Sequence, residues 1–312
     1  MGDLDYNAKV LGLPHYQSEM PCSICQCTKN GTNSYKNNSA TAPWLKSFWA
    51  PDQWKAWSGR SKCIIFDIAG LSGASVAPDW MHAAYLGAYQ YIFASILYIL
   101  CFDILDEEPI QNLKKCWDFL LGQYKNSKCR HSAINKLSFF VRKSGAHKLR
   151  GKAGEIKNIA KPMLKLWTEF HDAGNDIHKK ILLLMITLVD IETLLAEYSG
   201  EINLPEAAYK QFVKKTFLIA QLQQMLSDHF QGLNKPKVFS ATSKTHQILH
   251  AALYSKHVQP SLTWCFGGED YMRKIQNLGQ STVRGVNPHK TTIKMANHYR
   301  LGLHLHFEKL RV

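Results

Sequence analysis

The most constraining feature of this sequence is a stretch of twenty residues, 83–102, that carries no formal charge. A helix of that length must be covered on every side, either by lipid or by the rest of the protein. The stretch contains Gln90, Ser95 and four tyrosines, and a cluster of acidic residues follows it at 103–108. Small, polar and aromatic residues mixed in this way are typical of protein interiors. We therefore expect a buried core helix and no membrane span.

Apolar periodicity predicts helices over most of the remaining chain. Pro78 and Asp79, a candidate N-cap, open a long helix at 79–105. The other expected helices are 4–13, 109–125, 131–143, 155–171, 176–198, 205–232, 241–257, 268–281 and 288–300. Residues 63–68 and 262–266 are the candidate strands. The sequence predicts a mainly α protein.

Residues 21–73 are rich in Ser, Asn, Gly, Pro and Trp and show little helical periodicity. This composition predicts a loop-dominated segment, called the knuckle below. Large aromatic side chains must supply most of its buried area, because regular structure is scarce there. The expected core residues are Trp44, Trp49, Trp54 and Trp57.

A formal net charge of +14 favours a polyanionic partner such as DNA, RNA or an anionic membrane surface. Eight of the cations lie between residues 141 and 165, where Glu155 is the one acid. Such a surface contacts phosphates without reading sequence. A solvated pair of helices with its loop is the alternative explanation. The candidate DNA-binding residues are Arg142, Lys143, Lys148, Arg150 and Lys152.

No secretory signal is visible at the N-terminus, so we expect the eight cysteines to be reduced. Cys22 and Cys25 form a CxxC turn, a spacing that lets two thiolates reach one metal ion. His246 and His250 lie four residues apart on an expected helix and can present both imidazoles to one ion. Together these residues offer two-cysteine, two-histidine ligation of a structural zinc. Each pair also has a plainer explanation, because CxxC serves redox chemistry and most HxxxH pairs are coincidental.

Two further elements carry acids. Asp79 and His82 form a DxxH element at the start of the long helix, and Glu269 follows two glycines at the start of a later one. Asp79 as an N-cap and Glu269 beside a helix dipole are sufficient structural explanations. Neither element identifies a site alone.

Taken in order, these motifs resemble the CACTA-like DDE transposases. The ordered set is Gly2-Asp3-Leu4, the CxxC turn, Pro78-Asp79-Trp80-Met81-His82 with Leu86-Gly87, Lys244-x-His246-x3-His250, and Gly268-Glu269-Asp270-Tyr271-Met272-Arg273. The resemblance spans nearly the whole chain, although its motifs cover only roughly thirty residues. It implies an incomplete RNase H-like core with a long all-helical insertion and a loop-rich zinc knuckle, which is a mainly α chain.

The resemblance also implies residue roles. In that family three carboxylates hold two divalent ions for phosphodiester cleavage and strand transfer. Asp3 matches the second acid and Glu269 the third, with Mg²⁺ or Mn²⁺ as the catalytic ion. Asp79 and His82 match the family's DxxH and have a supporting role. The similar core of the V(D)J recombinase implies that one zinc, held by the CxxC and HxxxH pairs, ties the two acidic segments together.

The family's first acid precedes the second on an earlier strand, and this chain begins two residues before Asp3. We therefore expect no strand transfer by this chain alone. The resemblance implies three segments of one integrated domain: 1–78 with the second acid and the zinc knuckle, 79–240 as the helical insertion, and 241–312 with the HxxxH helix and the third acid.

The implied protein is nuclear and transposase-derived. It binds DNA and obtains the missing strands from a second copy or a partner chain. The alternative is a repurposed zinc-containing module that binds DNA or protein without catalysis. A zinc hydrolase of the HExxH type is disfavoured, because Gln-Ile-Leu separates the two histidines and supplies no general base.

Overall fold

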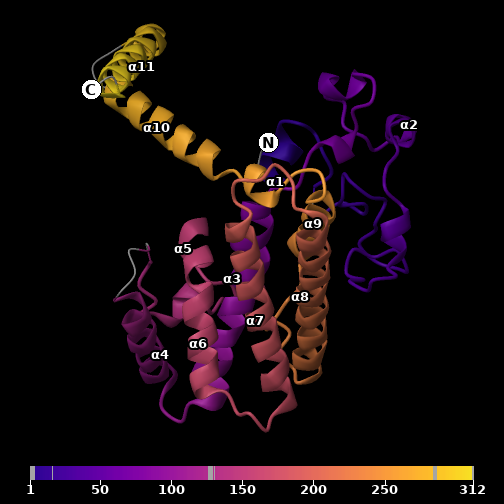
Figure 1. Cartoon of the computed structure of the whole chain (residues 1–312), viewed down its shortest axis with the longest axis vertical. Helices are drawn as coiled ribbons and strands as arrows, with labels where there is room; N and C mark the ends of the chain where they lie inside the picture. Colours follow the sequence, from indigo (N-terminus) through magenta and orange to yellow (C-terminus); the bar gives the residue numbers. More distant parts are fainter. Residues whose placement is uncertain (1–3, 16, 126–128, 130, 284–286, 311–312) are drawn as a thin grey trace. The chain divides into compact units, whose positions relative to one another are not determined.

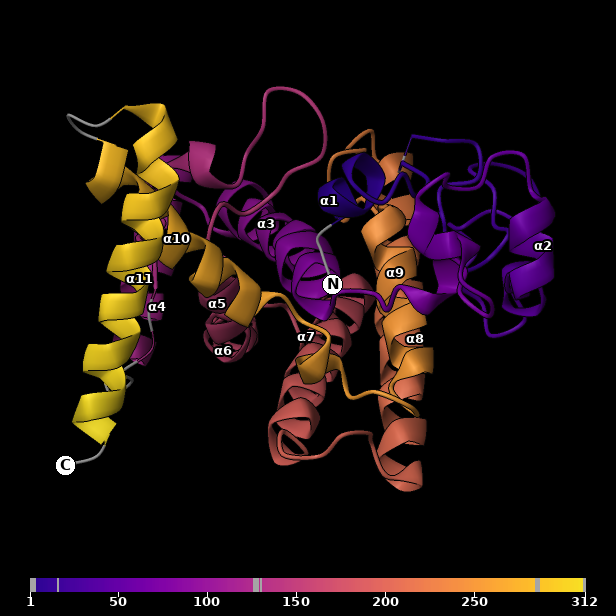
Figure 2. The same ribbon diagram turned by 90° about the horizontal axis from the view of Figure 1, so that it is seen from above.

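The computed structural model describes residues 4–15, 17–125, 129, 131–283 and 287–310. These residues form helices and loops, as Figures 1 and 2 show. Within these ranges the extended pairing consists of two isolated bridges, Cys25 with Phe48 and Thr28 with Ser34, and no strand occurs. The prediction of a mainly α protein is confirmed.

The principal helices are α1 (Leu4–Lys9), α2 (Pro51–Ala56), α3 (Tyr89–Ile99), α4 (Pro109–Tyr124), α5 (Ala153–Asn158), α6 (Ala160–Phe170), α7 (Asp176–Glu197), α8 (Glu206–Gly232), α9 (Ser243–Tyr254), α10 (Phe266–Val283) and α11 (Pro288–Leu310). Two π-helical segments, η4 (Met81–Ala88) and η5 (Leu100–Ile104), extend α3 at its two ends. Short 3-10 turns are η1 (Pro43–Lys46), η2 (Ile64–Asp67), η3 (Gly73–Ser75), η6 (Leu137–Phe139) and η7 (Pro260–Leu262).

The chain forms two compact units, residues 1–264 and 265–312. In the second unit α10 packs against α11. In the first, α6 packs on α7, α7 on α8, and α8 on α9, and Figure 1 shows these helices side by side. The three-segment division expected at 78/79 and 240/241 stays a prediction.

The uncharged stretch forms the centre of the first unit. Met81–Ile104 is a helix of 24 residues that is kinked at Gly87, where the backbone has φ −131° and ψ −112°. It is long and apolar enough to cross a bilayer, and 78% of its most apolar window is buried inside the protein. Two of its polar side chains form hydrogen bonds with other parts of the fold. Gln90 Nε2 donates to the Gly151 carbonyl at 3.3 Å, and Ser95 Oγ accepts from the Phe239 N–H at 2.7 Å. This coverage is what a core helix requires.

A close approach at Gly87 positions α9 against this core helix. A Cβ on Gly87 would lie 2.7 Å from Lys244 Cδ, 2.9 Å from Lys244 Cβ and 3.0 Å from the His82 carbonyl. The Lys244 ammonium donates to the Leu86 carbonyl at 2.9 Å. The glycine therefore allows the first turn of α9, which precedes His246, to pack against η4.

Local capping explains where two helices of the first unit, α7 and α9, begin. The Asn175 side chain accepts from the Ile177 and His178 N–H groups at the start of α7. Thr242 accepts from the Lys244 N–H at the start of α9. The predicted bounds of both helices agree with the structure to within three residues.

Three local predictions are wrong. Residues 131–143, where the sequence predicts a helix, have irregular backbone apart from η6. The chain after them forms backbone hydrogen bonds with more distant residues instead of helical ones. In that segment Leu149 donates to the Gln90 carbonyl at 2.9 Å, and Arg150 donates to the Phe139 carbonyl at 2.8 Å. The candidate strands 63–68 and 262–266 overlap η2, the end of η7 and the start of α10, and among the described residues no strand lies beside them to pair with.

The knuckle is organised by its tryptophans, as expected. Trp44, Trp49 and Trp54 are buried, while Trp57 is half-buried. The Trp49 and Trp57 rings stack with centroids 5.0 Å apart, and Trp54 meets Trp49 edge-on at 5.9 Å. These rings and Phe66 form one small core. A second core, described next, contains the cysteines.

Candidate metal centre

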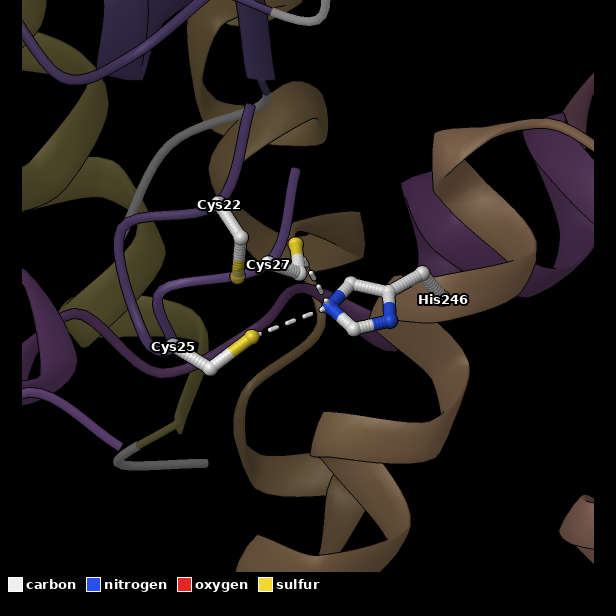
Figure 3. Close-up of side chains that lie close together, drawn as sticks. All are labelled: Cys22, Cys25, Cys27 and His246. Carbon is white, nitrogen blue, oxygen red and sulfur yellow. Dashed lines mark hydrogen bonds between the residues drawn. The ribbon is translucent and has the colours of Figure 1, made fainter. Parts of the chain in front are cut away.

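Three thiols from the knuckle converge on one imidazole of α9. Each of Cys22, Cys25, Cys27 and His246 offers one ligand atom, and the four atoms lie within 4.8 Å of one another. Cys25 Sγ is 3.4 Å and Cys27 Sγ is 3.5 Å from His246 Nε2. Figure 3 shows the three sulfur atoms around that nitrogen.

A second imidazole of α9 adjoins this group. His250 Nε2 lies 3.4 Å from Cys22 Sγ and 3.0 Å from His246 Nε2. Because the two histidines are four residues apart, they project from one face of α9. The structure thus brings together Cys22, Cys25, His246 and His250, the four expected zinc ligands, and adds Cys27 to them.

Backbone pairing inside the knuckle holds the thiols in place. The Gln26 N–H donates to the Ser47 carbonyl at 2.8 Å, and the Trp49 N–H donates to the Ile24 carbonyl at 3.0 Å. These bonds and the bridge between Cys25 and Phe48 fix the turn that carries the cysteines.

All five donor residues are almost fully buried, with at most 2% of each exposed. Aromatic rings enclose them: Trp44 meets His246 edge-on at 4.5 Å and His250 at 5.2 Å, and Phe48 meets His250 at 5.4 Å. The Phe217 ring of α8 stacks on Trp44 with ring centroids 6.4 Å apart. The cluster is closed to solvent, which is typical of structural zinc sites.

The pKa of each thiol depends on the groups around it. Burial opposes ionisation of Cys22, yet hydrogen bonds from Cys25 and Cys27 and the charge of His250 lower the pKa of its thiol well below the ordinary value. Hydrogen bonding to Cys22 and then burial raise the pKa of Cys25, and bonding to Cys22 also raises that of Cys27. Burial and then His250 lower the pKa of His246. A bound cation supplies the charge that allows further thiols to ionise.

The donor set fits zinc. Thiolate and imidazole donors, mutual distances compatible with tetrahedral ligation and exclusion of water are the properties of a closed zinc site. Residues that could hold the ion are the three cysteines and the two histidines of α9.

The remaining predicted site residues are the DxxH pair, Asp79 and His82, and the two acids, Asp3 and Glu269. Asp79 caps η4, where its Oδ1 accepts from the Met81 N–H at 3.0 Å and its Oδ2 contacts His82 Nδ1. Asp3 lies outside the described residues. Glu269 is on α10, and its side chain is also outside the described part of the chain. The approach of the two acids and their Mg²⁺ or Mn²⁺ ion therefore stay predictions.

The basic segment, residues 139–152, is partly buried through Phe140, His147 and Leu149 but exposes most of its cations. Arg142, Lys143, Arg150 and Lys152 are exposed. Lys148 is half-buried with its ammonium 5.6 Å from the centre of the Tyr91 ring, so it packs on the core helix. The four exposed cations remain available to a polyanion.

Two residues of interest were not predicted from the sequence. Cys27 lacks a spacing signature of its own. Glu192 lies on the apolar face of α7, where burial raises its pKa to about 7 despite the opposing effects of Lys157 and of hydrogen bonds from tyrosines. The Tyr85 hydroxyl donates to its Oε2 at 2.9 Å. The helical periodicity of α7 could have identified Glu192, because it places this acid on a face whose other residues are apolar, and that is unusual.

Comparison with known proteins found no match to any family model, curated protein or solved structure. The functional argument therefore depends on the chemistry of the sites.

Proposed function

We propose that this protein derives from a CACTA-like DDE transposase and that a structural zinc ion stabilises its fold. The observation that carries the proposal is the 3.4 Å approach of Cys25 Sγ to His246 Nε2 across 221 positions of sequence. The resemblance implied that the CxxC and HxxxH pairs share one ion. Their burial in one cluster supports that implication.

The zinc would connect the knuckle to the helices. The cysteine segment between residues 20 and 30 has no helix of its own, whereas His246 belongs to α9, which packs against both α8 and η4. A metal held by both parts stabilises the folded state, because the unfolded chain has no preformed site. In this proposal the zinc has no open coordination position and no catalytic role.

The second part of the proposal is DNA binding by the basic segment. Four exposed cations on a segment anchored to the core helix, in a chain of net charge +14, support electrostatic contact with phosphates. Such binding tolerates any sequence and suits a nuclear protein. Roles for Asp3 and Glu269 in a divalent-ion site, and a second copy or partner chain, are further consequences of the proposed origin.

Metal analysis tests the zinc. Purified protein should contain about one zinc per chain, and Cys25→Ser should lose the metal and lower the melting temperature. Cys63→Ser is the matched control, since Cys63 is half-buried in the knuckle away from the cluster. A folded wild-type protein without zinc would refute the metal proposal.

Salt dependence tests the DNA surface. The slope of log K against log salt falls by about 0.9 for each phosphate contact removed, so Arg142→Ala with Lys143→Ala should reduce it by roughly 1.8. The control is Lys210→Ala with Lys214→Ala, two exposed cations of α8. If both double variants had the same slope of log K against log salt, DNA would not bind at the basic segment.

A further inference from the structure

Resting on the zinc site proposed above, we infer that Cys27, and not His250, completes the coordination of the ion. His250 instead donates its Nε2–H to the Cys22 thiolate. The ion therefore has three thiolate ligands and one imidazole ligand. This differs from the two-cysteine, two-histidine set that the sequence predicts.

Mutual proximity of the donor atoms separates the two sets. Tetrahedral ligation requires each of four donors to lie close to the other three. The sulfur atoms of Cys22, Cys25 and Cys27 and the Nε2 of His246 satisfy this requirement. His250 Nε2 lies beside two members of this group, 3.4 Å from Cys22 Sγ and 3.0 Å from His246 Nε2. Four donors that are all mutually close already complete a tetrahedral site, so His250 adjoins that site at its Cys22–His246 edge.

The unused ring nitrogens favour the same assignment. The Nδ1 atoms of His246 and His250 are both buried, and neither has a hydrogen-bond partner within the described part of the chain. A histidine that binds metal through Nε2 carries its proton on Nδ1, so two histidine ligands would bury two unpaired N–H donors. With His250 outside the coordination sphere, its proton resides on Nε2 and is paired with Cys22. One unpaired donor and one unpaired acceptor then remain, and buried unpaired donors are the rarer and costlier defect.

The charge of the site assigns a role to His250. Three thiolates around Zn²⁺ leave a net charge of about −1 in a closed apolar cluster, which needs hydrogen-bond donors directed at sulfur. Two donors converge on Cys22: the Ile24 N–H at 3.3 Å and His250 Nε2 at 3.4 Å. His250 is therefore a positioning residue that acts on the ion through the Cys22 thiolate.

X-ray absorption on the zinc-loaded wild-type protein tests the ligand count without any substitution. We expect three sulfur neighbours at about 2.3 Å and one nitrogen at about 2.0–2.1 Å. Two sulfurs with two nitrogens would overturn the inference and leave the proposed zinc in place. A chain that binds no zinc would instead refute the proposed function.

Cobalt-substituted variants test the two roles separately. In Cys27→Ser, the thiolate-to-cobalt absorption should fall by about one third, since one of three thiolates is lost. In His250→Gln, the spectrum should keep its three-thiolate form while affinity falls about 10–100-fold, as for loss of a residue that supports a ligand. Cys63→Ser should match wild type. An unchanged spectrum in Cys27→Ser together with an altered ligand field in His250→Gln would refute the assignment.

Discussion

Glu192 provides a quantitative test of the packing described above. Its carboxyl group is fully buried on α7, where Tyr85 donates to Oε2, and the pKa of the group is about 7. Burial is the largest cause of the raised pKa. Substitution of Glu192 by Gln keeps the size of the side chain and the acceptor for Tyr85 but removes the titration.

The sign follows from proton binding. The folded protein binds the Glu192 proton more tightly than the unfolded chain, whose carboxyl has an ordinary pKa of 4.5. The stabilisation is therefore fully present below pH 4.5, is lost as pH rises, and is absent above about pH 7. The difference between the two pKa values corresponds to about 3 kcal/mol. Glu192→Gln should consequently gain stability over wild type as pH increases.

Urea unfolding at several pH values between 5 and 8.5, with saturating zinc, measures this effect. Comparing variant with wild type at each pH cancels the other titrating groups, including the metal ligands. The difference in free energy of unfolding should widen by about 2–3 kcal/mol across the range. Glu169→Gln, at an exposed position on α6, should follow wild type. Parallel profiles for wild type and Glu192→Gln would show that the carboxyl is not buried as described.

Three further substitutions test other contacts of the core. Lys157→Met should move the pH window of Glu192 upward, because the positive charge of Lys157 favours the ionised carboxyl; the same urea series measures it. Gly87→Ala should lower the free energy of unfolding by about 1–3 kcal/mol, because the added methyl group meets Lys244 and the His82 carbonyl. A loss below about 0.5 kcal/mol would contradict the close packing of α9 on Gly87. Trp44→Ala should cost about 3–5 kcal/mol and weaken zinc retention in a chelator competition, whereas unchanged retention would separate this ring from the site.

Helices with strong local signals were predictable from the sequence. Helices α7 and α8 begin at a capping Asn175 and after Pro205, and both agree with the expected ranges. The failures occur where tertiary pairing decides the conformation. The irregular segment before residue 152 donates to Gln90 of the core helix, a partner 59 positions away from Leu149. The π-helical segments η4 and η5 also leave no pattern distinct from an ordinary apolar helix.

The candidate site was predictable in its pairs but not in its full membership. CxxC and HxxxH each have a local spacing that metal binding explains, so Cys22, Cys25, His246 and His250 could be selected. Cys27 could not, because its orientation depends on the backbone pairing of Gln26 with Ser47 across the knuckle. That contact arises only after folding.

The surroundings of the cluster explain why a metal would be needed there. Cys22, Cys25 and Cys27 share one apolar core with Trp44 of the knuckle, Phe217 and Ala220 of α8, and Leu249 of α9. Without a cation, the histidines on the same face of α9 bring polar ring nitrogens into that core, where their Nε2 atoms face each other at 3.0 Å. Such polar atoms oppose burial unless they are ligated or hydrogen-bonded. A zinc ion would reverse their effect, because the thiols and the His246 imidazole would become ligands that join the knuckle to α9.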